Sequence, residues 1–215
     1  MNLSLLLATT GATTGTATHH LLTHLRRGAN VHKVLLAAAL ATMWAIAGWQ
    51  AAAGHIEWWW LPVPLLVAWL ETALTTVDIQ HRRLPNALTL PAYPAVAATV
   101  ALAATQAGWQ LAENALLGAT ILGTCYLTIH AISPKSMGAG DVKLSGTQGA
   151  VMGAVGLPAV AIGTALAALL TLLLPVITPQ RLRKQWQAGI PHGPALLTAT
   201  YVIATFPATR LPLSG

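Results

Sequence analysis

The chain has 215 residues, of which 55% are hydrophobic and only 7% are charged, and its formal net charge is +6 at pH 7. Soluble domains carry roughly 25% charged residues, so this composition excludes an ordinary soluble protein and predicts a polytopic membrane protein. In a soluble chain the basic excess would suggest nucleic-acid binding. Here the basic residues lie in short loops between apolar segments, where they set membrane topology. We therefore expect the lipid bilayer, and no nucleic acid, as a partner.

Apolar runs and their breaks predict eight helices. Several runs approach or exceed the ~20 residues that a helix needs to cross a hydrocarbon core, and each spanning segment must satisfy its own backbone hydrogen bonds. The predicted fold class is therefore all-α, a transmembrane bundle of about eight helices forming a single domain over residues 1–215. The expected helices are residues 3–24, 34–54, 58–78, 87–107, 111–132, 142–154, 157–178 and 192–208.

Pairs of glycines four residues apart occur in the first and sixth expected helices. The pairs are Gly11 with Gly15 and Gly149 with Gly153. Small residues at this spacing let the backbones of two membrane helices approach closely. Both helices are therefore candidates for tight packing against a neighbour.

Metal ligands are sparse along the chain. His20 and His24 share one helical face, but no cysteine or carboxylate lies near them, so the mixed ligand set of a typical metal site is missing. Cys125, the only cysteine, lies in an apolar run and is expected to pack in the core. We predict neither a metal nor another cofactor.

The third expected helix begins with three tryptophans and contains one acidic residue inside. Trp58, Trp59 and Trp60 stand at its start, where an aromatic belt at a membrane interface is expected. Glu71 lies seven residues before Asp78 and on a similar face. A membrane carboxyl is often functional, but polar packing inside the bundle accounts for Glu71 equally well.

Only two aspartates occur in the chain, and each adjoins a short polar stretch between apolar segments. The first stretch reads Asp78-Ile-Gln-His-Arg-Arg-Leu-Pro85-Asn86. Pro85 lacks a backbone donor and disfavours helical geometry at the residue before it. The chain is therefore expected to turn there, before the next helix begins near Asn86.

The second stretch reads Gly138-Ala-Gly140-Asp141-Val-Lys143. Its two glycines can adopt positive φ and let a substrate strand approach the backbone closely. Lys143 either holds negative charge in a site or serves only as a topogenic lysine. We interpret Gly138, Gly140, Lys143, Pro85 and Asn86 as substrate-binding or site-shaping residues around the two carboxylates.

The distribution of lysine and arginine predicts the orientation, because excess positive charge marks the cytoplasmic side. Alternate loops divide these residues ten to one, with Arg210 alone on the second side. Both aspartates then fall on the cytoplasmic side, at the end of the third helix and the start of the sixth. The ten are Arg26, Arg27, Lys33, Arg82, Arg83, Lys135, Lys143, Arg181, Arg183 and Lys184.

Two carboxyl groups within hydrogen-bond reach share a proton, so that one acts as base toward water and the other as acid. This is the arrangement of an aspartic protease. Asp141 at a helix N-terminus is favoured as the ionised base, whereas Asp78 near a helix C-terminus is favoured as the acid. The rival interpretation is an ion- or proton-coupled transporter that uses the same carboxylates, although transporter sites lie near the membrane midplane between repeated halves.

These motifs resemble the type IV prepilin peptidases, bacterial members of the Gly-x-Gly-Asp class of intramembrane aspartyl proteases. The run Asp78–Pro91 is similar to the family's first-aspartate segment, and Gly138–Leu144 is similar to the second. The stretch Ile190-Pro-His-Gly-Pro-Ala-Leu196 is similar to a Pro-Phe-Gly-Pro segment, with His192 in place of the aromatic residue.

The resemblance implies a prepilin or pseudopilin substrate and a catalytic pair formed by Asp78 and Asp141. The short leader would be cut on the cytoplasmic face of the bacterial inner membrane, without a metal or nucleotide, in support of type IV pili or protein secretion. Many bacterial members also carry Cys-x-x-Cys motifs associated with methylation of the new N-terminus. Only the short loop Arg26–Lys33 stands in that place, so methyltransferase activity is not expected.

Overall fold

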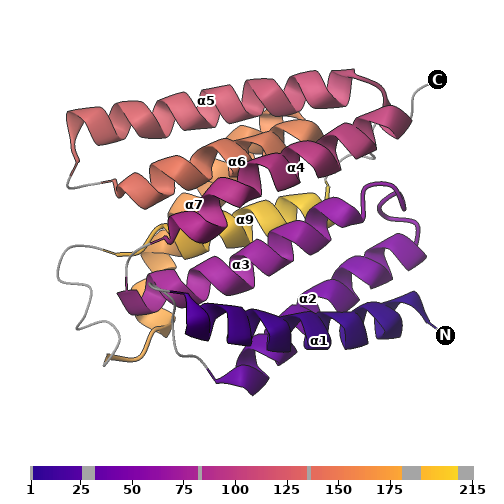
Figure 1. Ribbon diagram of the computed structural model, residues 1–215. Helices are drawn as coiled ribbons and strands as arrows, with labels where there is room; N and C mark the ends of the chain where they lie inside the picture. Colours follow the sequence, from indigo (N-terminus) through magenta and orange to yellow (C-terminus); the bar gives the residue numbers. More distant parts are fainter. Residues whose placement is uncertain (1, 26–31, 82–83, 135–136, 181–189, 208–215) are drawn as a thin grey trace.

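The computed structural model describes residues 2–25, 32–81, 84–134, 137–180 and 190–207, and these residues form eight helices and no strand (Figure 1). The predicted all-α bundle is confirmed. The helices are α1 (Leu3–His24), α2 (Lys33–Ala52), α3 (Pro62–His81), α4 (Asn86–Ala107), α5 (Gln110–Ile132), α6 (Ala139–Val155), α7 (Leu157–Ile177) and α9 (Gly193–Thr205).

Five of the described helices, α2, α3, α4, α5 and α7, are long and apolar enough to cross a membrane. The helix α1 has 22 residues but is not among the five, because its threonines and glycines lower its hydropathy. The helices α6 and α9 have 17 and 13 residues and fall short of the ~20 that a full crossing needs. The protein is thus a helical membrane protein, and its shortest helix needs a protein environment.

That environment is the centre of the bundle, where α9 packs against α3, α6 and α7 (Figure 1). Leu196, Leu197, Ala199 and Thr200 on α9 have no exposed surface. A short helix surrounded by other helices is not required to span the hydrocarbon by itself. The last described helix therefore forms part of the core.

Two helix pairs approach closely at glycines, as the small-residue spacing predicts. A Cβ atom on Gly11 would lie 2.9 Å from the Leu40 carbonyl oxygen, so α1 and α2 touch backbone to backbone. On the other side of the bundle, Gly149 and Gly153 of α6 face Gly118 of α5, and a Cβ atom on any of the three would collide with backbone. Close packing of α1 on α2 and of α5 on α6 is confirmed.

The expected roles of several apolar residues need correction. The helix α3 begins at Pro62 instead of Trp58, and Trp60 is fully buried with its indole N–H donating to the Ala204 carbonyl oxygen at 2.8 Å. Trp59 is also buried, so two members of the expected belt belong to the core. Cys125 is exposed, because it lies on the outer face of α5, and the prediction that it packs in the core is wrong.

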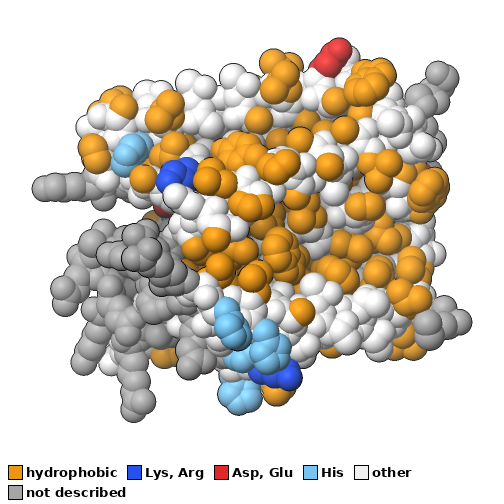
Figure 2. Space-filling view, viewed as in Figure 1, with side chains coloured by type: hydrophobic (Ala, Val, Ile, Leu, Met, Phe, Trp, Pro, Cys, Tyr) orange, Lys and Arg blue, Asp and Glu red, His pale blue; other side chains and the backbone are white. Residues whose placement is uncertain are grey.

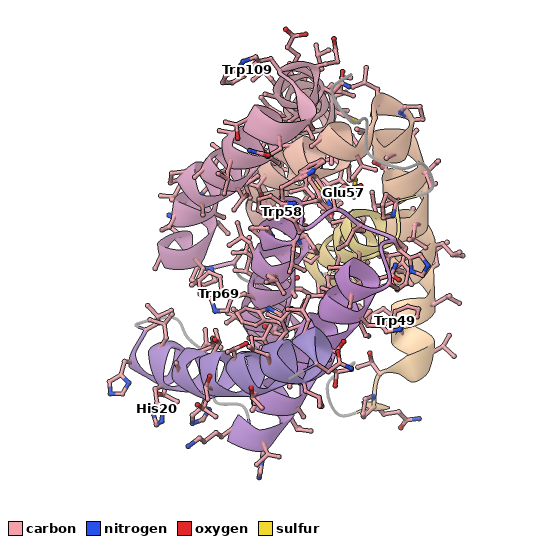
Figure 3. All side chains as sticks on the ribbon, turned by 90° about the vertical axis from the view of Figure 1, so that its right-hand side faces the viewer. His20, Trp49, Glu57, Trp58, Trp69 and Trp109 are labelled. Carbon is pink, nitrogen blue, oxygen red and sulfur yellow. The ribbon has the colours of Figure 1, made fainter. Side chains whose placement is uncertain are left out.

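The bundle has two chemically different ends. Trp49, Trp58 and Trp109 are largely exposed at one end, together with Glu57 (Figure 3), and we call it the tryptophan end. The other end holds the C-terminus of α3 and the N-terminus of α6, and we call it the aspartate end (Figure 1). Figure 2 shows that apolar side chains dominate the face between them.

Most of the basic residues that predict the orientation lie outside the described residues. Among those described, Lys33 begins α2 and Lys143 lies in the first turns of α6. Both therefore belong to the aspartate end. The residues outside the description are Arg26, Arg27, Arg82, Arg83, Lys135, Arg181, Arg183, Lys184 and Arg210.

Candidate active site

The carboxyl groups of Asp78 and Asp141 converge on the first residue of α9, Gly193. A Cβ atom on Gly193 would lie 2.9 Å from Asp78 Oδ2 and 3.2 Å from Asp141 Oδ1. These two oxygens are therefore no farther apart than the sum of the two distances. Residues 63 positions apart in the sequence thus face one small space at the aspartate end.

The two aspartates occupy opposite ends of their helices. Asp78 lies in the last turn of α3, three residues before His81, and is only 6% exposed. Asp141 is half-buried in the first turn of α6. A helix dipole favours negative charge at its N-terminus and disfavours it at its C-terminus. The ionised form is therefore favoured at Asp141 and disfavoured at Asp78, as their positions in the sequence predict.

The glycines beside Asp141 act through their size and not through a positive φ. Gly138 has φ −69° and ψ 141° and caps α6, and Gly140 is helical. A Cβ atom on Gly138 would lie 3.3 Å from Asp141 Oδ2, and one on Gly140 would lie 3.2 Å from the Leu84 side chain. Neither glycine uses the positive φ that its residue type permits, and the space beside Asp141 comes from the missing side chains.

The two aspartate motifs are joined by hydrogen bonds. Pro85 caps α4 in extended geometry and the helix begins at Asn86, as predicted. The Lys143 ammonium donates to Asn86 Oδ1 at 3.0 Å, and the Tyr93 hydroxyl donates to the Lys143 carbonyl oxygen at 2.8 Å. Lys143 therefore connects the first residue of α4 to the first turns of α6.

His192, immediately before Gly193, is bonded through both ring nitrogens. Its Nε2 lies 2.7 Å from the Tyr126 hydroxyl of α5, and its Nδ1 lies 2.7 Å from the Thr171 hydroxyl of α7. Burial lowers the pKa of the ring below its usual 6.5. The residue is therefore a neutral imidazole at pH 7 that connects α9 to two neighbouring helices.

Glu71 lies farther along α3 and contacts the same central helix. The Thr198 hydroxyl of α9 donates to Glu71 Oε1 at 2.7 Å. Among the described residues no group bonds to Glu71 Oε2, which is fully buried. Because Glu71 connects α3 to α9, its contact supports the polar-packing interpretation.

An apolar cavity of about 310 Å³ lies between α4 and the α5–α6 pair. Its walls are mainly alanines and valines, and Tyr93 and Gly146 line the part nearest the aspartate end. Gly146 follows Asp141 by five residues on α6, so the cavity begins about one helical turn from the carboxyl. In the described part of the chain, no group of three or more His, Cys, Asp or Glu residues is placed to hold a metal.

The sequence of residues 65–175, just over half of the chain, matches the model of the type IV leader peptidase family. The chain belongs to this family. The matched segment contains both aspartates and ends before His192 and Gly193. No curated protein and no solved structure is significantly similar to the chain.

The sequence predicted the positions of the two aspartates of this member of the type IV leader peptidase family but not the residues that surround them. Gly193 gives no spacing signal that would place it between two carboxyls. Tyr126 precedes His192 by 66 positions, and Thr171 is one of many threonines in apolar helices. Only the Ile190–Leu196 segment, noted for its resemblance to the family, pointed to this side of the site.

Proposed function

We propose that the protein is a membrane aspartyl endopeptidase that removes the N-terminal leader from prepilins or pseudopilins. The observation that carries the proposal is the convergence of Asp78 Oδ2 and Asp141 Oδ1 on Gly193. Membership of a leader peptidase family supports a peptidase, and paired carboxyls are a known means of activating water. The reaction would take place at the aspartate end, which we expect from the loop charges to face the cytoplasm, and the membrane would be the bacterial inner membrane.

The proposed chemistry needs one proton shared between the two carboxyls. Asp141, ionised at the N-terminus of α6, accepts a proton from a water molecule as its oxygen forms a bond to the scissile carbonyl carbon. Asp78, protonated at the C-terminus of α3, donates a hydrogen bond to the carbonyl oxygen in this step. When the carbon–nitrogen bond breaks, a proton passes to the departing amine and the pair returns to its single-proton state. The apparent pKa values of such a dyad belong to the pair.

The apolar cavity beside α6 gives the apolar part of such a substrate a place next to the reacting bond. Its small-residue walls suit a helix backbone that approaches closely. Tyr93, which lines the cavity, bonds to Lys143, two residues after Asp141. A chain leaving the carboxyls would thus enter an apolar environment within about one helical turn.

Co-expression with candidate prepilins tests the proposal, with leader removal followed by mass spectrometry. Asp78→Ala and Asp141→Ala are each expected to reduce cleavage by at least about a thousandfold, because each removes half of a two-group catalyst. Glu113→Ala is the matched control, since Glu113 is an exposed carboxylate on α5 far along the chain from either motif. Its cleavage rate should equal that of the unaltered protein.

Full cleavage by either aspartate variant would exclude the two-carboxyl mechanism. A transporter that used the same carboxylates would leave prepilins uncut in every case. It would instead show a proton or cation flux in proteoliposomes that both aspartate substitutions abolish. The two assays together separate the two functions.

A further inference from the structure

The His192 ring stands at the junction of three helices. Its backbone carbonyl accepts from the Leu196 N–H at 3.1 Å and so starts α9, while its ring nitrogens reach Tyr126 on α5 and Thr171 on α7. The next residue is Gly193, which lies against both carboxyls. The residue held by these bonds is therefore joined directly to the glycine that faces the two aspartates.

The hydrogen bonds of the neighbours determine which nitrogen of His192 carries the proton. The Thr171 hydroxyl donates to the Ala167 carbonyl oxygen at 2.7 Å, so its oxygen is left to accept from His192 Nδ1–H. The Tyr126 hydroxyl then donates to the unprotonated Nε2. This order satisfies every donor in the chain from Tyr126 through His192 and Thr171 to Ala167.

We propose that His192 is a positioning residue, a neutral Nδ1–H imidazole whose bonds to Tyr126 and Thr171 fix Gly193 against Asp78 and Asp141. This inference rests on the proposed peptidase function for its catalytic consequence but not for the hydrogen-bond arrangement itself. A phenylalanine at position 192 would fill the same space, yet it could not form either bond. The arrangement is thus a consequence of histidine at this position.

Protonation of His192 would disrupt this chain of hydrogen bonds. A second N–H on the ring requires the Tyr126 oxygen to accept, which leaves the Tyr126 proton without its acceptor in a buried place. The titratable groups around the ring are Tyr126 itself and, beyond it and Gly193, Asp141 and Asp78. Tyr126 and the protonated Asp78 are neutral, and burial lowers the pKa of the His192 ring.

The pH dependence follows from that direction. Above about pH 6.5, the usual value for histidine, the ring is neutral in both the folded and the unfolded protein, and the positioning bonds are complete. As the pH falls from 6.5 toward the lowered pKa, the unfolded chain takes up a proton before the folded protein does, so the folded protein loses stability. Below the lowered pKa the ring is charged in both states and the Tyr126 bond is reversed.

The tautomer can be measured without any substrate. In detergent-solubilised protein with ¹⁵N-labelled histidine, the resonances absent from His192→Phe belong to His192. We expect a protonated Nδ1 and an unprotonated Nε2 at pH 7.5, a shift of the Nε2 resonance in Tyr126→Phe, and titration below pH 6.5. A protonated Nε2, or identical His192 resonances in Tyr126→Phe and Thr171→Val, would overturn the proposed arrangement.

The catalytic consequence is measured on a purified prepilin substrate. His192→Phe, Tyr126→Phe and Thr171→Val are each expected to lower kcat about tenfold with little change in KM. Each variant removes at least one of the hydrogen bonds that hold His192, and with it the backbone of Gly193, in place. His192→Gln, whose amide can both accept and donate, should retain more activity than His192→Phe. Recovery in the glutamine variant separates lost hydrogen bonds from lost packing.

Matched controls come from the same helices or residue types. Thr164→Val on α7 removes a hydroxyl that donates to the Val160 carbonyl oxygen within its own helix, and Tyr201→Phe removes one that donates to the Met43 carbonyl oxygen. Both should keep kcat within about twofold. If the three test variants also keep it, His192 has no positioning role. If the unaltered protein cuts no prepilin while the tautomer is as expected, the proposed function fails and the arrangement stands.

Discussion

Glycines serve opposite purposes in two regions of this protein. Where α5 meets α6, Gly118, Gly149 and Gly153 leave no space, because each lies against the backbone of the facing helix. At the aspartate end, Gly138 and Gly193 keep a space open around the carboxyl groups. The same residue type lets two helices touch in one region and keeps side chains away from two carboxyl groups in the other.

An added methyl group should therefore affect mainly stability in the first region and mainly activity in the second. Adding one methyl group between α5 and α6 must push two helices apart, so the cost falls on folding. Adding one methyl group at the aspartate end displaces only carboxyl oxygens, which can rotate, so the cost falls on their geometry. Alanine substitutions in the two regions should therefore produce opposite patterns in the two measurements.

Among the glycine substitutions, Gly193→Ala is expected to have the largest effect on activity. Its Cβ atom would lie 2.9 Å from Asp78 Oδ2 and 3.2 Å from Asp141 Oδ1, so the carboxyls must move although neither is altered. A displacement of this kind costs about a hundredfold in rate. Leader cleavage should fall by this factor while the thermal unfolding temperature stays near that of the unaltered protein. Cleavage at the normal rate would show that the carboxyls react elsewhere than beside Gly193.

Gly118→Ala is expected to show the opposite pattern, with a loss of stability. Its Cβ atom would collide with the Gly149 carbonyl oxygen and would lie 2.8 Å from Gly153 Cα. Overpacking of this kind costs about 1–3 kcal/mol. Unfolding in mixed micelles should report that loss, while folded enzyme keeps its kcat.

Gly123→Ala on the same helix is the matched control. There a Cβ atom would lie 3.8 Å from Gly146 Cα, an ordinary contact. This variant should be unchanged or slightly more stable, because alanine reduces the freedom of the unfolded chain. Equal losses in Gly118→Ala and Gly123→Ala would contradict the close α5–α6 contact.

The sequence allowed the helices and the two aspartates to be predicted because both leave local signals. Apolar runs indicate helices, and Pro85 marks the turn before α4. The position of α9 at the centre could not be predicted, since nothing in a 13-residue apolar helix distinguishes a central place from a peripheral one. The predictions that Cys125 packs in the core and that Trp60 lies in an interfacial belt were wrong for the same reason. The neighbours of a residue in the fold decide its burial.

Lys143 offers a test of how the two motifs cooperate. Lys143→Met keeps the length of the side chain but removes its charge and its bond to Asn86, whereas Asn86→Ala removes the bond alone. Because the lysine is exposed, the bond itself is worth little. We expect cleavage to fall about tenfold in Lys143→Met and about twofold in Asn86→Ala. Equal losses would show that Lys143 acts only through Asn86 and not through its charge.

An effect on KM alone is expected from filling the apolar cavity. Ala150→Leu on α6 adds three carbon atoms to a wall of the cavity between α4 and α5, far enough from Asp141 to leave the carboxyls in place. If the apolar segment of the substrate occupies this cavity, KM should rise about threefold with kcat unchanged, because binding is weakened equally in the ground and transition states. A truncated, water-soluble leader peptide lacks that segment and should be cut at the same rate by both proteins. A fall in kcat instead would place Ala150 in the support of the aspartate end, and the region of α6 that serves activity would then extend beyond the glycines around Asp141.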